Sequence, residues 1–113
     1  MKGKEIAGKD VARIYYISGK ENEFHNLQAG KDIREWQVGD EGVVNEIASY
    51  VNTAWRGQHA KWGTSAVIDY LVLEVPSKFQ KHLDYLAIED TSMEIFNSRN
   101  PGILIFGVFV EHF

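Results

Sequence analysis

The chain has 113 residues, a length typical of one domain, with ordinary fractions of hydrophobic (44%) and charged (25%) residues. It contains no cysteine, which excludes disulfide bonds and cysteine-based zinc or nucleophile sites, and which fits a reducing compartment such as the cytoplasm. Its net charge of −4 disfavours a surface that coats DNA or RNA, because phosphate binding needs local positive charge.

The chain is expected to begin with a loose polar lead-in over residues 1–10, followed by a strand. Residues 11–17 (VARIYYI) alternate in the manner of a strand and are largely apolar on both faces. A strand that is apolar on both faces lies inside a sheet, so this pattern predicts a central strand.

A short helix is predicted to follow this strand. Ser18 and Glu21 form an S-x-x-E pattern, which is typical of a helix capping box. The helix would turn Phe24 and Leu27 toward the core and end at Gly30.

A long amphipathic helix over about residues 40–56 is the clearest predicted element. Asp40 would cap its N-terminus and Gly57 would end it. Apolar side chains recur along it at helical spacing and form one stripe: Val43, Val44, Ile47, Val51, Ala54 and Trp55.

The second half of the chain is predicted to be richer in strands. Residues 66–75 (AVIDYLVLEV) are a strand that Pro76 stops, and residues 85–89 are consistent with another. Between them, the S-x-x-Q pattern that starts at Ser77 predicts a short helix.

The C-terminal part is predicted to form a hairpin. Residues 92–96 and 103–111 flank the sequence NSRNPG, in which Pro101 and Gly102 suit a type II turn. The expected fold is therefore a single α+β domain over residues 1–113. It would have a mixed or antiparallel sheet, the long helix on one face and two short helices.

The histidines show no metal-binding spacing, and we expect no metal site. They are most simply surface residues; a ribonuclease-like acid–base pair of His25 and His59, assisted by Lys61, is the alternative. The set comprises His25, His59, His82 and His112.

Two kinds of charged residue on predicted strands need an explanation. Arg13 lies on the central strand, where a guanidinium needs an anion, either a carboxylate of the protein or a phosphate of a ligand. Glu74, Glu94 and Glu111 most simply face solvent, but Glu94 stands just before the hairpin turn, where a sheet edge can open into a cleft.

The stretch TAWRGQHAKWGTS, residues 53–65, combines basic and aromatic residues. Arg56 and Lys61 could hold phosphates, and Trp55 or Trp62 could stack on a base. The alternative is a plain turn, because Trp55 and Gly57 already have places in the predicted helix.

The order of three of these residues resembles the R-S-E arrangement of ADP-ribosyltransferase domains, including those of bacterial polymorphic toxins. The matching positions are Arg13 in ARIYYIS, Ser65 in WGTSAVIDYLVLEVP and Glu94 in SMEIFNSRNPG. The resemblance implies a cleft that binds NAD as substrate. Arg13 would anchor NAD, Ser65 would support the site, and Glu94 would stabilise the transition state or orient the acceptor.

Residues near Ser65 complete the predicted NAD site. Lys61, Trp62 and Thr64 would contact the dinucleotide, with Gly63-Thr64-Ser65 standing where the family has S-T-S. No E-x-E surrounds Glu94.

Two functional hypotheses follow from the sequence. The first is a small ADP-ribosyltransferase-like toxin or effector domain that acts in a cytoplasm. The second is a non-enzymatic acidic binding protein, such as an inhibitor or immunity protein, that covers a basic protein partner. In neither case is a membrane partner expected, since the apolar run at residues 103–110 is too short to cross a bilayer.

Overall fold

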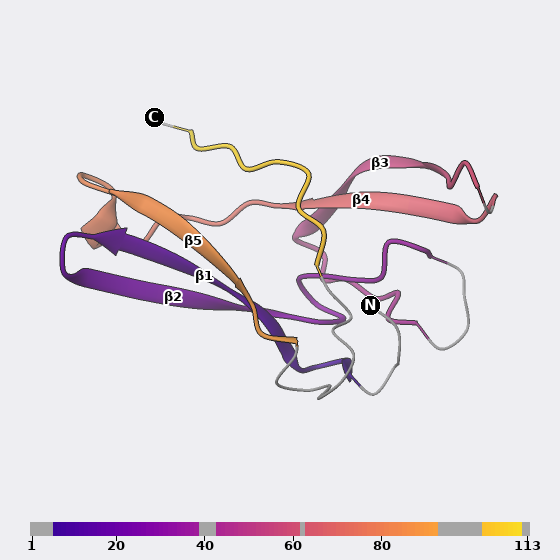
Figure 1. Cartoon of the computed structure of the whole chain (residues 1–113), viewed down its shortest axis with the longest axis horizontal. Coiled ribbons are helices and arrows are strands. Elements are labelled where there is room, and N and C mark those ends of the chain that lie inside the picture. Colours follow the sequence, from indigo (N-terminus) through magenta and orange to yellow (C-terminus); the bar gives the residue numbers. More distant parts are fainter. Residues whose placement is uncertain (1–5, 39–42, 62, 93–102, 112–113) are drawn as a thin grey trace.

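The computed structural model describes residues 6–38, 43–61, 63–92 and 103–111. It contains two small antiparallel sheets, one of three strands and one of two (Figure 1). None of the helical turns among the described residues reaches seven residues. The predicted α+β class with a long helix is therefore wrong, because the described chain is built mainly from strands.

The three-stranded sheet has the order β2-β1-β5 and is antiparallel throughout. Its strands are β1 (Asp10–Ser18), β2 (Glu21–Gln28) and β5 (Tyr85–Asp90). The predictions of strands at residues 11–17 and 85–89 are confirmed, and β1 occupies the predicted central position.

A tight hairpin, and not a helix, follows β1. Ser18 pairs with Glu21 across a two-residue loop whose first residue, Gly19, has φ 61°, as in a type II′ turn. The S-x-x-E pattern was therefore a turn and not a capping box. In β2, Leu27 is buried whereas Phe24 is 53% exposed, because residues an odd number apart in a strand point to opposite faces.

The described residues of the predicted long helix are not helical: residues 51–56 belong to a strand of the second sheet, and residues 43–50 precede that strand. β3 (Val51–Gln58) pairs with β4 (Ser65–Leu71) from Val51↔Leu71 to Gln58↔Ser65. Residues 43–55 include three Val, two Asn and one Thr, which have low helix propensity, so pairing with β4 prevails over the helical spacing. The proposed cap, Asp40, lies outside the described residues.

The structure confirms only part of the remaining predicted elements. β4 confirms the first part of the 66–75 strand but ends at Leu71, and the second short helix is only a 3-10 turn, η2 (Ser77–Phe79). Of the predicted hairpin, residues 93–102 lie outside the described residues, and residues 103–111 are extended but belong to no strand.

The core lies at the end of the three-stranded sheet where β1 begins and β2 ends. It is a cluster of Ile6, Val11, Ala29 and Val44, against which Ile33 and Ile103 pack. Ile6 is fully buried, which the predicted loose lead-in did not anticipate.

A polar clamp joins the segment after β2 to the second sheet. Arg34 binds Asp69 through two hydrogen bonds, Nε to Oδ2 at 2.8 Å and Nη2 to Oδ1 at 3.0 Å. Thr53 Oγ1 donates to the same Asp69 oxygen at 3.1 Å, so the clamp links β3 and β4 as well. Nearby, Gln37 forms an isolated antiparallel bridge with Ala66 at the start of β4.

A candidate protein-binding face

One face of the three-stranded sheet gathers aromatic and charged side chains from all three strands. We call it the Arg13 face, and it comprises Arg13, Tyr15, Phe24, Asn26 and Glu89. The strand register explains the grouping: Arg13 is paired with Asn26 on one side and Glu89 on the other, and Tyr15 is paired with Phe24. Paired residues in adjacent strands point to the same face, so these side chains meet.

Arg13 is held by neighbours on both adjoining strands. Its Nε donates a 3.1 Å hydrogen bond to Asn26 Oδ1, and its Nη1 lies 4.0 Å from Glu89 Oε1. Its guanidinium carbon lies 5.2 Å from the centre of the Phe24 ring, within the range of a cation–π contact. The sequence predicted that Arg13 needs an anion, and the carboxylate of Glu89 is an anion within the protein, at the long ion-pair distance of 4.0 Å.

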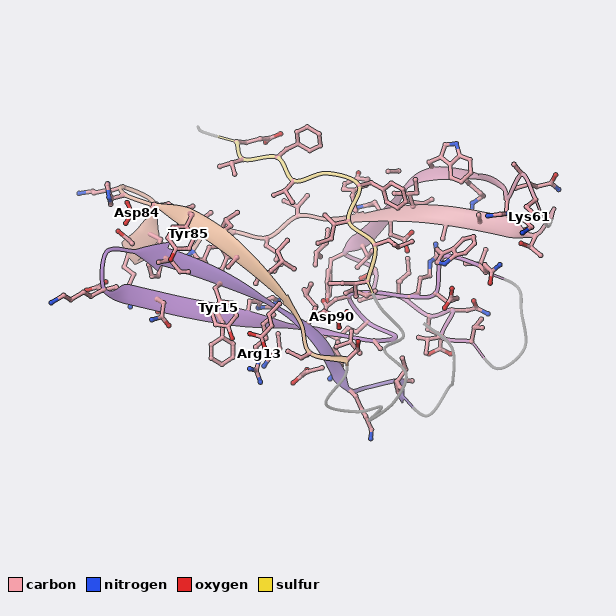
Figure 2. The ribbon with its side chains drawn as sticks, in the orientation of Figure 1. Arg13, Tyr15, Lys61, Asp84, Tyr85 and Asp90 are labelled. Atoms are coloured by element: carbon pink, nitrogen blue, oxygen red, sulfur yellow. The ribbon has the colours of Figure 1, made fainter. Side chains whose placement is uncertain are left out.

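Tyr15 completes the arrangement. Its hydroxyl donates a 3.0 Å hydrogen bond to Glu89 Oε2, and its ring centre lies 5.7 Å from that of Phe24. Figure 2 shows Arg13 and Tyr15 projecting on the same side of the ribbon. These contacts hold Arg13, Tyr15 and Phe24 in defined orientations.

The Arg13 face is open to solvent. Phe24 is 53% exposed, and the side chains of Arg13 and Glu89 are 33% and 47% exposed. At the far end of the same face Tyr85, paired with Ile17, is 58% exposed. Tyrosine, phenylalanine and arginine are the residue types enriched in protein interfaces, so the composition suits docking of a protein.

The predicted NAD site is spread over separate parts of the molecule. Arg13 belongs to the three-stranded sheet, whereas Ser65 is the first residue of β4 in the other sheet. Lys61, in the loop just before β4, lies well away from Arg13 in Figure 2. Glu94 lies outside the described residues. The structure therefore does not bring Arg13 together with Ser65.

The loop between β3 and β4 is a hairpin loop. His59 N–H donates to the Thr64 carbonyl at 2.8 Å, and Gly63 N–H donates to the His59 carbonyl at 2.8 Å. Lys61 N–H donates to His59 Nδ1 at 3.1 Å, and the ring of Trp36 lies 5.4 Å from the His59 ring. These bonds give the loop a structural role as a turn. Trp62 lies outside the described residues.

Gly57 is also structural, though it does not end a helix. It lies inside β3, and a Cβ atom at this position would stand 2.4 Å from Cζ2 of Trp55. The Trp55 ring therefore lies over Gly57, and no larger residue fits there without moving the ring.

A second polar cluster lies at the turn before β5. Asp84 accepts hydrogen bonds from Gly19 N–H at 2.6 Å and from His82 Nε2 at 2.7 Å. The Gly19 N–H is the main cause of a lowered pKa for Asp84, and His82 adds to it. The cluster borders an open depression of about 480 Å³ lined by residues 80–86 and by Val110.

The described histidines lie on different elements: His25 is in β2, His59 is in the loop between β3 and β4, and His82 is in the turn before β5. His25 and His82 lie on the surface, as predicted, and the ring of His59 lies tilted against that of Trp36. Among the described residues, no group of three His, Asp or Glu could hold a metal ion. His112 lies outside the described residues.

Sequence reasoning identified Arg13 but missed its neighbours. Phe24 was assigned to the inward face of a helix, and Glu89 was not singled out. The available signal was the alternation of Arg13 with Tyr15 on a central strand, which requires polar residues at paired positions of the adjacent strands.

Comparison of the chain with family models, with curated proteins and with solved structures finds no match. Within the described part of the chain, no helix has the length and apolar character needed to span a membrane.

Proposed function

We propose that the chain is a binding protein that docks a protein partner on its Arg13 face without catalysing a reaction. The observation that carries this proposal is the set of cross-strand contacts that fixes Arg13, Tyr15 and Glu89 around the exposed ring of Phe24. Side chains that are already ordered lose little conformational entropy on binding, which favours affinity.

The charge of the chain indicates what kind of partner it is. With a net charge of −4, the chain attracts a basic protein more readily than an acidic one. On the Arg13 face, Glu89 is 47% exposed and lies 4.0 Å from Arg13, so its charge is only partly compensated. We propose that a basic group of the partner approaches Glu89 while an apolar group covers Phe24.

The placement of the predicted NAD-binding residues supports binding over catalysis. An ADP-ribosyltransferase would need Arg13 and Ser65 at one cleft, and the two residues stand in different sheets. Arg13 is also engaged by Asn26 and Glu89, which leaves its guanidinium less available to a phosphate.

Capture experiments with matched variants test the proposal. Immobilised wild-type protein and two single variants, Phe24→Ala and His25→Ala, are exposed to extract of the cells that make the protein. His25 is the control, because it is exposed on β2 next to Phe24 but points to the opposite face. We expect one partner to be retained by the wild type and by His25→Ala, and lost by Phe24→Ala.

The salt dependence of retention tests the nature of the partner. A basic partner should be released more readily as salt concentration rises, since charged groups attract less through screened solvent. A partner retained equally by all three proteins, or none retained by the wild type, contradicts the proposal.

A further inference from the structure

The C-terminal residues 103–111 form an extended, apolar and exposed segment. Ile103 packs against the core and anchors one end. Beyond it, six apolar side chains are each at least 52% exposed: Leu104, Ile105, Phe106, Val108, Phe109 and Val110. Residues 103–110 carry no charged side chain.

This pattern is typical of a strand that is covered on both faces. If residues 104–110 adopt strand geometry, Leu104, Phe106 and Val108 point one way, and Ile105 and Phe109 point the other. Both sets are apolar, as in strands buried between two layers. The segment therefore has the composition of an interior strand but is extended in solvent.

The three-stranded sheet offers a place for such a strand. β5 pairs with β1 on one side only, and no strand among the described residues pairs with its outer edge. An unpaired edge presents a row of free backbone N–H and C=O groups that another strand can bind. β5 has six residues and the segment has nine, so the segment is long enough to pair along the whole edge.

The segment passes this edge in its own chain without pairing with it. Val110 and residues 80–86 line the same open depression of about 480 Å³. Figure 1 shows the segment (yellow) running past β5 (orange) as a separate trace. Within one copy, residues 103–111 belong to no strand, and β1 is the only described strand paired with β5.

We propose that the C-terminal segment of one copy pairs with the outer edge of β5 in a second copy, and that the exchange is reciprocal. Each chain carries both complementary parts: an exposed apolar segment, and a sheet edge that no described strand covers. Two copies can therefore pair reciprocally, and the assembly closes as a dimer. Strand addition to an exposed edge is a common mode of association, in which backbone hydrogen bonds supply affinity.

The exposed area fits a dimer of ordinary size. A phenylalanine side chain carries about 150–250 Å² of surface. Phe106 and Phe109 are 70% and 92% exposed, and four aliphatic side chains add to them. Together they offer several hundred Å², of the order of the roughly 800 Å² that each partner contributes to a stable interface.

Light scattering coupled to size-exclusion chromatography tests the proposal over a series of protein concentrations. Wild-type protein should have twice the mass of the 113-residue chain at the higher concentrations. Two proline variants, Val108→Pro and Phe109→Pro, remove consecutive backbone N–H groups, which point to opposite sides of a strand. At least one of them should therefore be monomeric, while Val108→Thr stays dimeric.

Hydrogen exchange locates the contact. In the dimer, the amides of residues 85–90 and 103–111 should be protected relative to the monomeric proline variant. Phe24→Ala should leave the dimer intact, because Phe24 lies on the Arg13 face and not on the outer edge of β5. The partner-binding proposal and the dimer proposal can therefore fail independently, and the experiments distinguish the two failures.

Four results would overturn the inference. They are a wild-type monomer at every concentration, an open-ended series of oligomers, a dimer that both proline variants retain, and a dimer in which β5 amides exchange as fast as in the monomer.

Discussion

Tyr15 on the central strand β1 donates a 3.0 Å hydrogen bond to Glu89 on the edge strand β5, across 74 residues of chain. The other oxygen of the same carboxylate lies 4.0 Å from Arg13. Glu89 therefore positions an aromatic ring and a guanidinium at once. The Arg13 face exists only because β5 returns beside β1 in this register.

The clamp between Arg34 and Asp69 should be important for folding. Their side chains are only 11% and 14% exposed, and removing one partner leaves the other charge poorly solvated. We expect Asp69→Ala to lower the free energy of unfolding by about 3 kcal/mol, measured by urea denaturation. The control is Lys78→Ala, whose ion pairs with Glu21 and Glu23 are exposed and should contribute less than about 1 kcal/mol. Equal effects of the two variants would show that the clamp is not a stabilising link.

Ile6 should be a core residue and not part of a loose lead-in. Its side chain is fully buried against Val11, Ala29 and Val44. We expect Ile6→Ala to cost about 2–5 kcal/mol, since it removes buried methyl groups and leaves a cavity. Val72→Ala is the control, because Val72 is 77% exposed and its truncation should change stability by less than about 0.5 kcal/mol. An unchanged melting temperature for Ile6→Ala would contradict the described core.

Strands whose own sequence alternates could be predicted from the sequence. β1 and β4 are rich in Val, Ile and Tyr, and the two apolar faces of β1 indicated its central position. The pattern around β3 was ambiguous, because Val43, Val51 and Trp55 are spaced as on one face of a helix. β3 is fixed by pairing with β4, which is a non-local interaction that a local pattern does not contain.

The candidate site was predictable only in part for the same reason. The need of Arg13 for an anion follows from its place on a central strand. That the anion is Glu89 depends on the register of β5 against β1, in which Arg13 is paired with Glu89 and Tyr15 with Ala87. The exposed position of Phe24 depends on the Gly19 turn, which the sequence pattern of a capping box concealed.

The hydrogen bond between Tyr50 and Asp32 should make the free energy of unfolding depend on pH in the alkaline range. Tyr50 donates a 2.5 Å hydrogen bond to Asp32 Oδ1, and this bond is the main cause that raises the pKa of Tyr50 from 10.0 to about 12. The bond needs the protonated phenol. Its contribution to stability is therefore complete below pH 10 and is lost as the pH rises through about 12.

The comparison of wild type with Tyr50→Phe measures this contribution. Denaturant midpoints of the two proteins should differ near neutral pH and converge as the pH approaches 12. The other titrating groups are common to both proteins, so they cancel in the difference. A difference that stays constant over this range would contradict the assignment.

The separation of Arg13 from Ser65 leads us to expect no cleavage of NAD. Nicotinamide release by wild-type protein, alone and with cell extract, should equal that of a no-protein control, and calorimetric titration with NAD should show no binding. The loop at Lys61 should likewise give no change of tryptophan fluorescence with NAD or ATP. Cleavage that Arg13→Ala or Ser65→Ala abolishes would restore the enzymatic hypothesis.

The affinity of the captured partner for Phe24→Ala, compared with His25→Ala, tests the role of the Arg13 face most directly. Both changes truncate an exposed ring on β2, but only Phe24 lies beside Arg13 and Tyr15. By isothermal titration calorimetry we expect Phe24→Ala to raise Kd roughly 30-fold, equivalent to about 2 kcal/mol, and His25→Ala to leave it unchanged. Equal affinities for the two variants, or a loss confined to His25→Ala, would contradict the assignment of the binding face.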